Sequence, residues 1–358
     1  MPVSSICKRQ VFDIPQIKAP IVVEHQFEIK RCPGCCKKVE TQITGVSNTP
    51  VQYGPNTKAV VLYLYASNYI PDDRTSKIMQ DLFGMSLSAA TVKNMVEECA
   101  YKVYPVTKKI EAKLINAPVK HVDESGMRID GKIKWAHALC NDKLTHYRLP
   151  QKRSDIQQNL TGVVVHDYFK PYYSRLKDAQ HAVYNAHILR ELKAVSEIDK
   201  EPWAEDMANA LLSGYKKSQQ NRDEISAKWL TRFKNLYDKI IDTGIEFHEK
   251  LGFLKQQKTG RFKRRPGHNL LLRLQNNSED VLRFLHDPNV PFTNNCAEQA
   301  LRMIKVKQKI SGCFRTYRWA IHFLEIRAYL ASAQKQGYNV FDALSSVFQT
   351  GPINLVLD

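Results

Sequence analysis

The sequence predicts an α/β protein whose core is interrupted by an all-α insertion and preceded by a helical region and a small β- and cysteine-containing segment. Three observations carry this prediction. Strand-like apolar runs and near-alternating stretches are concentrated between residues 119 and 168. Residues 186–285 carry apolar positions three and four apart almost throughout, which is typical of helices. Residues 1–55 are instead rich in Pro, Val and charge.

Composition narrows the partners and the compartment. The 358 residues carry a formal net charge of +17, which indicates a polyanionic partner such as DNA or RNA, although a basic soluble enzyme is the plain alternative. No apolar run approaches the roughly 18 residues that a membrane helix needs, and the first residues lack the apolar core of a secretory signal. The 8 cysteines are mostly scattered, so we expect a reducing, cytoplasmic setting without a disulfide framework.

The N-terminal segment, residues 1–55, contains half of a zinc-binding pattern. Cys32 and Cys35 form a CxxC in the stretch CPGCC. A structural zinc site normally needs four ligands, and no second CxxC follows. Cys7 and His25 are candidates to complete the set, but their spacing is irregular. A cysteine-containing turn without metal is therefore the slightly favoured interpretation, and zinc remains the alternative.

Residues 56–118 form the predicted helical region. The stretch MSLSAATVKNMVEE indicates a helix, a short turn and a second helix that starts near Ser88. A helix-turn-helix of this kind is a candidate DNA-binding element. Plain helix packing is the more common cause of the same pattern.

The first part of the predicted core covers residues 119–195. Buried strands are expected in VKHVD and GVVVHD, with a hairpin between KIKWAHALC and KLTHYRLP and a helix-like SDIQQNL. This order of strand, hairpin, helix and strand is the one with which an RNase H-like α/β domain begins. Residues 196–290 form the predicted helical insertion, and residues 291–358 the second part of the core, where two helices flank the glycine-containing KISGCFRTYR.

Three acidic residues from distant parts of the chain are the candidate catalytic group. Asp123 follows the first strand, Asp167 ends the strand GVVVHD, and Glu298 lies at the start of a basic helix. The carboxyl ends of strands in open α/β sheets are where ligands bind. Two aspartates and a glutamate can hold two divalent cations for phosphoryl transfer on nucleic acid.

Each acid also has an ordinary structural interpretation. Asp123 precedes the turn-prone ESG, with Glu124 and Asp130 as rival candidates, and strand alternation would point Glu124 to the opposite face. Asp167 could cap a turn. Asn295 and Glu298 have the spacing of a capping box.

Basic residues are the candidate DNA contacts. One group follows Glu298 on its predicted helix and the next segment, and a second group breaks the helical insertion between residues 255 and 265. Such charges would neutralise a phosphate backbone, although a solvated charged face is the plain alternative. The two groups are Arg302, Lys305, Lys307, Lys309 and Arg315, and Lys258, Arg261, Lys263, Arg264 and Arg265.

Histidines and tyrosines that follow the second aspartate are further candidates for binding metal or DNA. His181 and His187 are candidate metal ligands or DNA contacts, but their six-residue spacing makes a shared metal unfavourable. Tyr168, Tyr172 and Tyr173 could stack on bases, with burial expected for at least one of them.

The ordered set of motifs resembles the transposases of the insertion sequence 66 family over nearly the whole chain, from about Arg9 to Gly351. The resemblance is specific because it rests on seven segments in order. They are RQVFDIP, VQYGPNTKAVVLYL, HVDESGMRIDGKIKWAH, GVVVHDYFKPYY, HAVYNAHILREL, LRFLHDPNVPFTNNCAEQALRMIKVKQKISGCFRT and ASAQKQGYNVFDAL.

This resemblance implies an RNase H-like DDE domain with Asp123, Asp167 and Glu298 as the metal-binding triad. It implies two Mg²⁺ or Mn²⁺ ions, nicking of transposon ends and strand transfer into target DNA in a bacterial cytoplasm, at the nucleoid. Inverted repeats and target DNA would be the partners, with a homo-oligomer assembled on DNA and accessory proteins of the same element. Recognition of the repeats is expected in residues 1–110.

Three departures from the family pattern favour an alternative. The family's coiled region and first cysteine pair are missing before RQVFDIP, which predicts an N-terminally truncated copy. Tyr184 replaces a usual Cys, and Thr293 and Gln299 replace a usual Asp and Arg. The alternative is a truncated or decayed, non-catalytic DNA-binding derivative that acts as a repressor or complex partner. A structure-specific nuclease is a third hypothesis.

Overall fold

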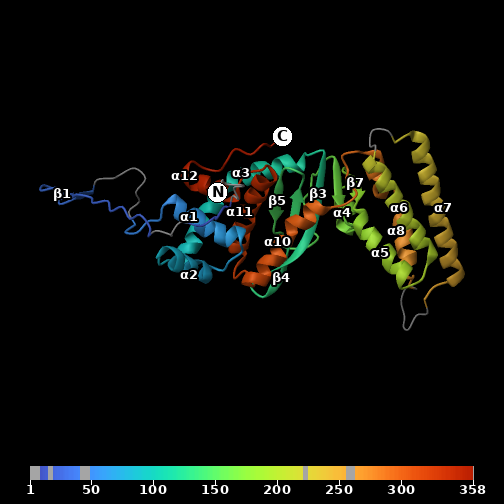
Figure 1. The fold of residues 1–358 in the computed structure, drawn as a ribbon, viewed down its shortest axis with the longest axis horizontal. Helices are drawn as coiled ribbons and strands as arrows, with labels where there is room; N and C mark the ends of the chain where they lie inside the picture. Colours follow the sequence, from blue (N-terminus) through green and yellow to red (C-terminus); the bar gives the residue numbers. More distant parts are fainter. Residues whose placement is uncertain (1–8, 15–18, 41–48, 221–224, 255–262, 358) are drawn as a thin grey trace, which may run out of the picture.

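The computed structural model describes residues 9–14, 19–40, 49–220, 225–254 and 263–357 (Figure 1). A central sheet separates a group of helices built from both ends of the chain from a second group built from the middle (Figure 1). The whole is a mixed α/β arrangement, as the sequence predicts. Within these residues, no helix is long and apolar enough to cross a membrane.

The central sheet has five strands in the order β5-β4-β3-β6-β7. β3, β4 and β5 form an antiparallel meander, and β6 and β7 continue the sheet in parallel with β3. The strands that the sequence predicts are all present, and β7 is an additional one that the HAVY pattern did not reveal. Their bounds are β3 Val119–Ile129, β4 Lys132–Cys140, β5 Thr145–Arg148, β6 Val163–His166 and β7 Gln180–Val183.

The sequence suggests a turn in the stretch ESG directly after Asp123, but the structure has its turn further along the chain. Glu124, Ser125 and Gly126 continue β3 and pair with β4, so ESG is strand and not turn. The chain reverses instead at Asp130 and Gly131, whose φ angles are 48° and 68°. Two successive residues with positive φ are what a tight hairpin turn requires, and Asp-Gly is a favoured pair for it. Asp123 is therefore a residue of a central strand.

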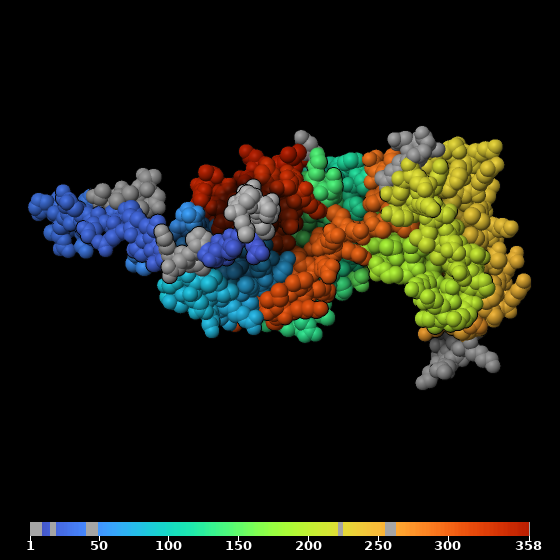
Figure 2. Space-filling view, viewed as in Figure 1, coloured from blue at the N-terminus to red at the C-terminus, as the bar shows by residue number. Residues whose placement is uncertain are grey.

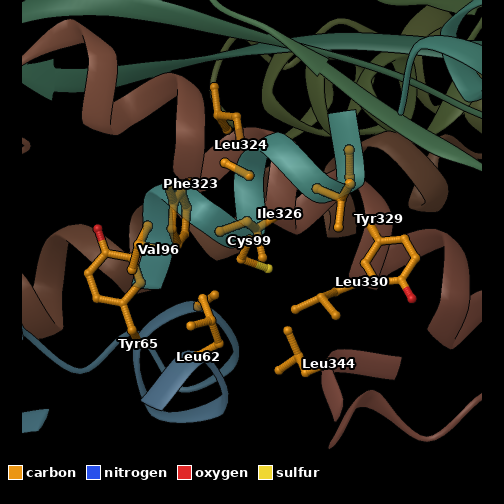
Figure 3. Packing of buried hydrophobic residues seen from close by; sticks show 14 of the residues in the cluster. Leu62, Tyr65, Val96, Cys99, Phe323, Leu324, Ile326, Tyr329, Leu330 and Leu344 are labelled. Atoms are coloured by element: carbon orange, nitrogen blue, oxygen red, sulfur yellow. The ribbon is translucent and has the colours of Figure 1, made fainter. Parts of the chain in front are cut away.

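The helices from the two ends of the chain share one buried core. α3 packs along α11, and α1 packs against α12. Figure 3 shows Leu62, Val96, Cys99 and Phe323 meeting in this core. The residues 56–118 that we expected to form a separate helical region are thus continuous with the core. The bounds are α1 Pro55–Leu62, a π-helical turn at Tyr63–Ser67, α2 Asp72–Phe83, α3 Ala89–Ile115, α11 Tyr317–Lys335 and α12 Val340–Gln349.

The expected helix start near Ser88 is confirmed. Ser88 is the N-cap of α3, and its hydroxyl accepts a hydrogen bond from the backbone N–H of Thr91. A serine at this position satisfies a backbone donor that the first helical turn leaves unpaired.

The described residues between 185 and 286 are helical almost throughout, as the sequence predicts, and form the second group of helices. Trp203, Met207, Phe233 and Tyr237 belong to the buried cluster that holds them together and reaches β6 and β7. Among the basic residues expected here, Lys258 and Arg261 lie outside the described residues. The bounds are α5 Asn185–Glu197, α6 Pro202–Gln220, α7 Ala227–Leu251, α8 Pro266–Asn276 and α9 Ser278–His286.

Two other expectations for secondary structure were wrong. The stretch SDIQQNL is not helical. Ile156 and Leu160 are buried against the sheet, but Asn159 has a φ of 60°, which a helix does not tolerate. The C-terminal part has three helices and not two, because Gly337 with a φ of 82° and the N-cap Asn339 separate α11 from α12. The third of these helices, α10, spans Asn295–Ser311.

The N-terminal segment contributes a two-stranded hairpin, β1 Ile29–Arg31 and β2 Lys38–Glu40, which Figure 1 places away from the sheet. Cys32 and Cys35 lie in its turn and are exposed. Cys7 lies outside the described residues.

Candidate active site

The start of α10 is fixed to the middle of β3. Asn294, the residue before the helix, is fully buried. Its side-chain oxygen lies 2.7 Å from Nδ1 of His121, and its amide nitrogen donates to the carbonyl of Val122 over 3.3 Å. Buried polar groups need such partners, so this contact sets the register between helix and sheet. It brings Glu298 over the face of β3 that carries Asp123.

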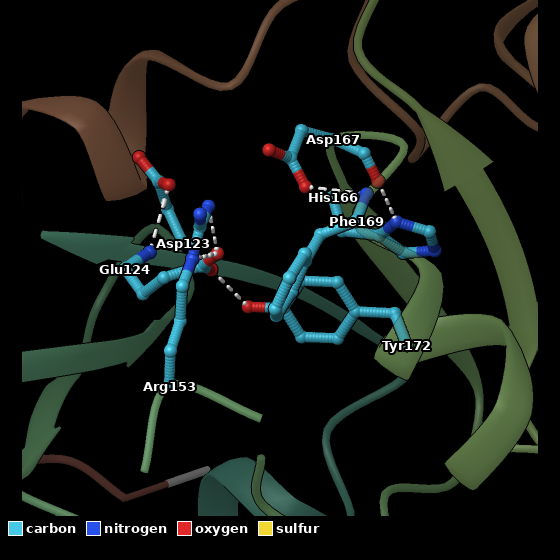
Figure 4. A network of polar contacts seen from close by, with 7 residues as sticks. All are labelled: Asp123, Glu124, Arg153, His166, Asp167, Phe169 and Tyr172. Atoms are coloured by element: carbon cyan, nitrogen blue, oxygen red, sulfur yellow. Dashed lines mark hydrogen bonds and ion pairs between the residues drawn. The ribbon is translucent and has the colours of Figure 1, made fainter. Parts of the chain in front are cut away.

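Asp123 lies on β3, and Asp167 directly follows β6, the neighbouring parallel strand. β3 pairs with β6 in a register that matches Val119 with Val163 and His121 with Val165. Continued by two residues, this register sets Asp123 beside Asp167. Figure 4 shows both carboxyl groups on the same side of the sheet. Asp167 thus lies at the end of its strand, as the sequence predicts, whereas Asp123 lies within β3 and is brought to it by the parallel pairing of β3 with β6.

Backbone donors orient both aspartates. The N–H of Phe169 donates to Oδ1 of Asp167 over 2.9 Å, and the N–H of Glu124 donates to Oδ1 of Asp123 over 2.8 Å (Figure 4). Each contact leaves the second carboxylate oxygen of its residue pointing away from the bonded amide. The turn-capping role considered for Asp167 is therefore real, and it does not use up the carboxylate.

Glu124 belongs to a different network on the opposite face of β3. Its carboxylate accepts two hydrogen bonds from Arg153, of 2.9 and 2.8 Å, and one from the hydroxyl of Tyr172 over 2.8 Å (Figure 4). The Arg153 guanidinium is also stacked between Trp135 and Phe169. Arg153 thus donates twice to Oε1 and Tyr172 once to Oε2, so both oxygens of Glu124 are engaged in a structural network, on the face that strand alternation predicts. Asp130, the other rival, is an exposed turn residue.

Glu298 is held by residues at and near the start of α5. Its Oε1 accepts a 2.7 Å hydrogen bond from the hydroxyl of Tyr184 and a 3.2 Å bond from Arg190, and it lies 3.5 Å from Nε2 of His187. All three contacts reach the same oxygen. The capping-box interpretation was wrong, because the side chain points to α5 and not back to the start of its own helix. His187 is therefore a neighbour of the acidic group, whereas His181 bonds to His166.

The acidic residues influence one another electrostatically. Burial, joined by the charges of Glu124, Asp167 and Glu298, raises the pKa of Asp123 to about 7, against the opposing effect of the Glu124 N–H. For Glu298, burial also favours the neutral form, but hydrogen bonds from Tyr184 and Arg190 outweigh it and lower the pKa. Like charges brought together in this way disfavour full ionisation unless a cation compensates them.

Asp123 and Glu298 line a common cleft of about 330 Å³. The α10 side of this cleft carries Arg302 and Lys305 as well as Glu298, and the Lys305 ammonium donates to the carbonyl of Gly126 over 2.9 Å. Figure 2 shows α10, in orange, crossing the surface between the two groups of helices. Arg302, Lys305, Lys309, Arg315, Lys263 and Arg264 are exposed, and Arg265 is partly buried.

Lys307 departs from the expectation for this basic face. Only 6% of it is exposed. Its ammonium lies 5.1–5.8 Å from the ring centres of Tyr65, Phe314 and Phe323, and burial lowers its pKa to about 8. The helical period turns position 307 toward the core while 305 and 309 face outward. Lys307 is thus a core residue in this structure and not a surface contact.

The side chains present suit a hard divalent cation in their chemistry. Asp123, Asp167 and Glu298 offer only carboxylate oxygens, which Mg²⁺ and Mn²⁺ prefer. Within the part of the chain that the structure describes, no group of three or more His, Cys, Asp or Glu is arranged to hold a metal ion. The same statement covers the hairpin with Cys32 and Cys35. The charges of Asp167 and Glu298 reach Asp123, so the three carboxylates are near one another. The side chain of Glu298 is, however, turned toward Tyr184 and Arg190.

The residues that hold Glu298 and Glu124 were missed by sequence reasoning. Tyr184 was noted only as a departure from a family pattern, and Arg190 and Arg153 were not singled out. Their partners are distant in sequence: Tyr184 and Glu298 are 114 positions apart. Tyr172 was expected among candidates for base stacking, and it is buried with Glu124 instead. Tyr168 and Tyr173 are partly buried.

Comparison with known protein families identifies one match. The family described as "Transposase IS66 family" matches residues 50–321, which is most of the chain. The matched range includes the sheet, the helical insertion and α10 with Glu298. No protein among curated sequences matches at a significant level.

Proposed function

This chain belongs to the IS66 family of transposases, and from that premise we propose that it nicks transposon ends and joins them to target DNA through a DDE carboxylate triad. The observation that carries the proposal is the meeting of Asp123, Asp167 and Glu298 at one end of the sheet, beside a cleft with a basic wall. The antiparallel meander continued by two parallel strands supports an RNase H-like core.

Asp123, Asp167 and Glu298 would hold the divalent cations. When bound, a pair of such ions supplies the positive charge that stabilises the attacking and the leaving oxygen of phosphoryl transfer. The raised pKa of Asp123 supports this role, because a carboxyl group that is costly to ionise alone gains most from a nearby cation. Glu298 would have to exchange contacts with Tyr184 and Arg190 to join the two aspartates.

The exposed cations of α10 would hold the DNA backbone beside the carboxylates. Arg302 and Lys305 line the same cleft as Asp123 and Glu298. Neutralising phosphates with Arg and Lys gives affinity without sequence preference. The cations would therefore position the strand, while recognition of the element's own ends would come from residues nearer the N-terminus.

The deciding experiment compares Asp167→Asn with the wild type on a labelled duplex that carries the element's flanking end, in Mn²⁺. We expect cleavage by the wild type and none by the variant, with DNA affinity nearly unchanged, because the substitution removes a ligand and no DNA contact. Asp130→Asn is the matched control, since it makes the same chemical change at an exposed turn and should cut normally. Full cleavage by Asp167→Asn would rule out the assigned triad.

A non-catalytic DNA-binding role is the second candidate. It is favoured by the contacts of Glu298 with Tyr184, Arg190 and His187 and by the lack of a preformed metal-binding group among the described residues. The same experiment separates the two. Binding of the end without cleavage by the wild type or by Asp130→Asn, in either Mn²⁺ or Mg²⁺, would favour the repressor-like derivative.

A further inference from the structure

Two cysteines that are distant in sequence, one from the sheet and one from α10, are in contact. Cys140 is the last residue of β4, and Cys296 is the second residue of α10. Their sulfur atoms lie 2.8 Å apart although the residues are 156 positions apart in the chain. A disulfide has its sulfurs about 2.05 Å apart, so only a small local movement separates this contact from a bond.

The surroundings hold Cys296 in place for such a bond. Its sulfur donates to the carbonyl of Asn141 over 3.1 Å. The ammonium of Lys335 lies 3.2 Å from the same sulfur and is itself fixed by the carbonyls of Asn141 and Leu144, at 2.6 and 3.1 Å. Cys296 is therefore anchored from two sides with its sulfur directed at Cys140.

The two sulfurs differ in their exposure to solvent. Cys140 is fully buried, whereas Cys296 is partly exposed. A reagent from solution would reach Cys296 first, and the Cys140 sulfur, which lies 2.8 Å away, would then be positioned to resolve the product. Packing of two small apolar side chains is the plain alternative, because buried free cysteines are common.

We propose that Cys140 and Cys296 form a reversible disulfide that ties the first turn of α10 to the end of β4. The oxidant is a low-molecular-weight disulfide. The Cys296 sulfur, having released its proton, attacks one sulfur of that molecule and expels the first thiolate. The Cys140 sulfur then loses its proton, attacks the Cys296 sulfur and expels the second thiolate. The two protons end on the two released thiols, and the two cysteines are oxidised together.

The consequence is local to the helix that carries Glu298. Glu298 lies in the same first turn of α10 as Cys296. A bond to β4 would restrict the movement of this turn relative to the sheet. The inference does not depend on the proposed catalysis, because the bond forms or fails to form whatever the enzyme does.

The test uses the full chain, reduced and then incubated with oxidised glutathione at neutral pH. Free thiols are blocked by alkylation, and the digest is mapped by mass spectrometry. We expect a cross-linked pair of peptides containing Cys140 and Cys296, lighter by two hydrogen atoms than the reduced pair and lost on reduction. Recovery of both cysteines as separately alkylated or glutathione-bound peptides would overturn the proposal.

Two variants keep the test specific. Cys296→Ser should abolish the cross-link, whereas Cys313→Ser, at an exposed cysteine just beyond α10, should leave it intact. Oxidation should also raise the melting temperature of the wild type and of Cys313→Ser, but not that of Cys296→Ser, because the bond closes a long loop. An equal rise in all three proteins would show that some other pair is responsible.

Discussion

At the scale of the residue, Asp123 combines a structural cost with a proposed role. Its pKa rises from 3.8 to about 7 on folding. The folded protein therefore binds more protons than the unfolded chain between these values, and stability falls as the pH rises through that window. Such a cost at a buried carboxyl group is expected where a ligand later compensates it.

We therefore expect Asp123→Asn to be more stable than the wild type at pH 8 in the presence of EDTA, by about 2–4 kcal/mol. The difference should shrink toward zero as the pH falls below 3.8, where the wild-type carboxyl is protonated in the unfolded as well as in the folded state. Urea denaturation across this pH range measures it. Adding Mn²⁺ should then stabilise the wild type more than the variant, because the variant lacks a charged ligand.

Asp130→Asn again serves as the control and should show neither effect. A variant that is less stable than the wild type at pH 8 would mean that Asp123 is held by partners that favour its charge. Burial would then not be the dominant influence on the pKa of Asp123, and this pKa would not be raised by folding.

Sequence reasoning proposes Asp123 and Asp167 because each comes after an apolar run, which is a local signal. It could not locate the contacts of Glu298. Tyr184 and Arg190 reach Glu298 only because α5 and α10 meet in the fold. The local alternative, a capping box, used the nearest partners in sequence and was wrong for that reason.

At the scale of the element, α10 shows how one helix serves two environments. Ala297, Leu301 and Ile304 are buried. Lys305 and Lys309, in the second half of the helix, face outward, and Lys307 faces inward. The sequence marks all three lysines as basic, but only the helical phase relative to the sheet decides which of them reaches solvent, and that phase is set by Asn294.

We expect Lys309→Gln to weaken binding to any duplex and to reduce the slope of log affinity against log salt by about 1, as for a lost phosphate contact. Lys307→Met should change neither quantity. It should instead alter stability, because the buried ammonium has its pKa lowered to about 8. Wild-type stability should rise as the pH increases from about 8 toward 10.5, since the unfolded chain binds more protons there. This rise should be smaller in Lys307→Met, which keeps only the contribution of Lys120, whose pKa burial also lowers to about 8.

Fluorescence anisotropy at several salt concentrations and thermal unfolding between pH 7 and 10 are the measurements. Loss of DNA affinity in Lys307→Met equal to that in Lys309→Gln would mean that Lys307 leaves the core when DNA binds.

The extent of β3 likewise depends on its neighbour in the fold and not on its own sequence alone. From the sequence it ends at Asp123, because ESG is rich in turn-forming residues. In the fold it continues to Ile129, because β4 pairs with it along its whole length. Pairing with a neighbour overrides local turn preference. Asp-Gly at positions 130 and 131, where a tight turn does need positive φ, was the better signal.

At the scale of the whole molecule, the N-terminal part of the chain contributes to the buried core only from about Tyr53 onward. α1, α2 and α3 pack with α11 and α12 in one buried cluster. Among the described residues, the three buried clusters include no residue before Tyr53. Recognition of transposon ends by residues 1–110 is therefore better tested with a shorter deletion, because removing all 110 residues would open the core.

We expect a protein that lacks residues 1–49 to keep its melting temperature within about 3 °C of the full chain, since the deletion removes little buried surface. It should bind unrelated duplexes almost as tightly as the full chain, through the cations of α10. Its preference for the element's own end over a scrambled duplex should fall at least about tenfold, which corresponds to about 1.4 kcal/mol of specific contact.

Competition binding at fixed salt, with the end and the scrambled duplex in turn, measures this preference. The matched control is the full chain with Cys32 and Cys35 both changed to Ser, which separates a requirement for these thiols from a requirement for the segment as a whole. If the shortened protein kept full preference for its own end, specific recognition would belong to the helices of the core. The exposed faces of α2 and α3 would then be the surface to examine, because their inner faces are committed to packing against the rest of the molecule.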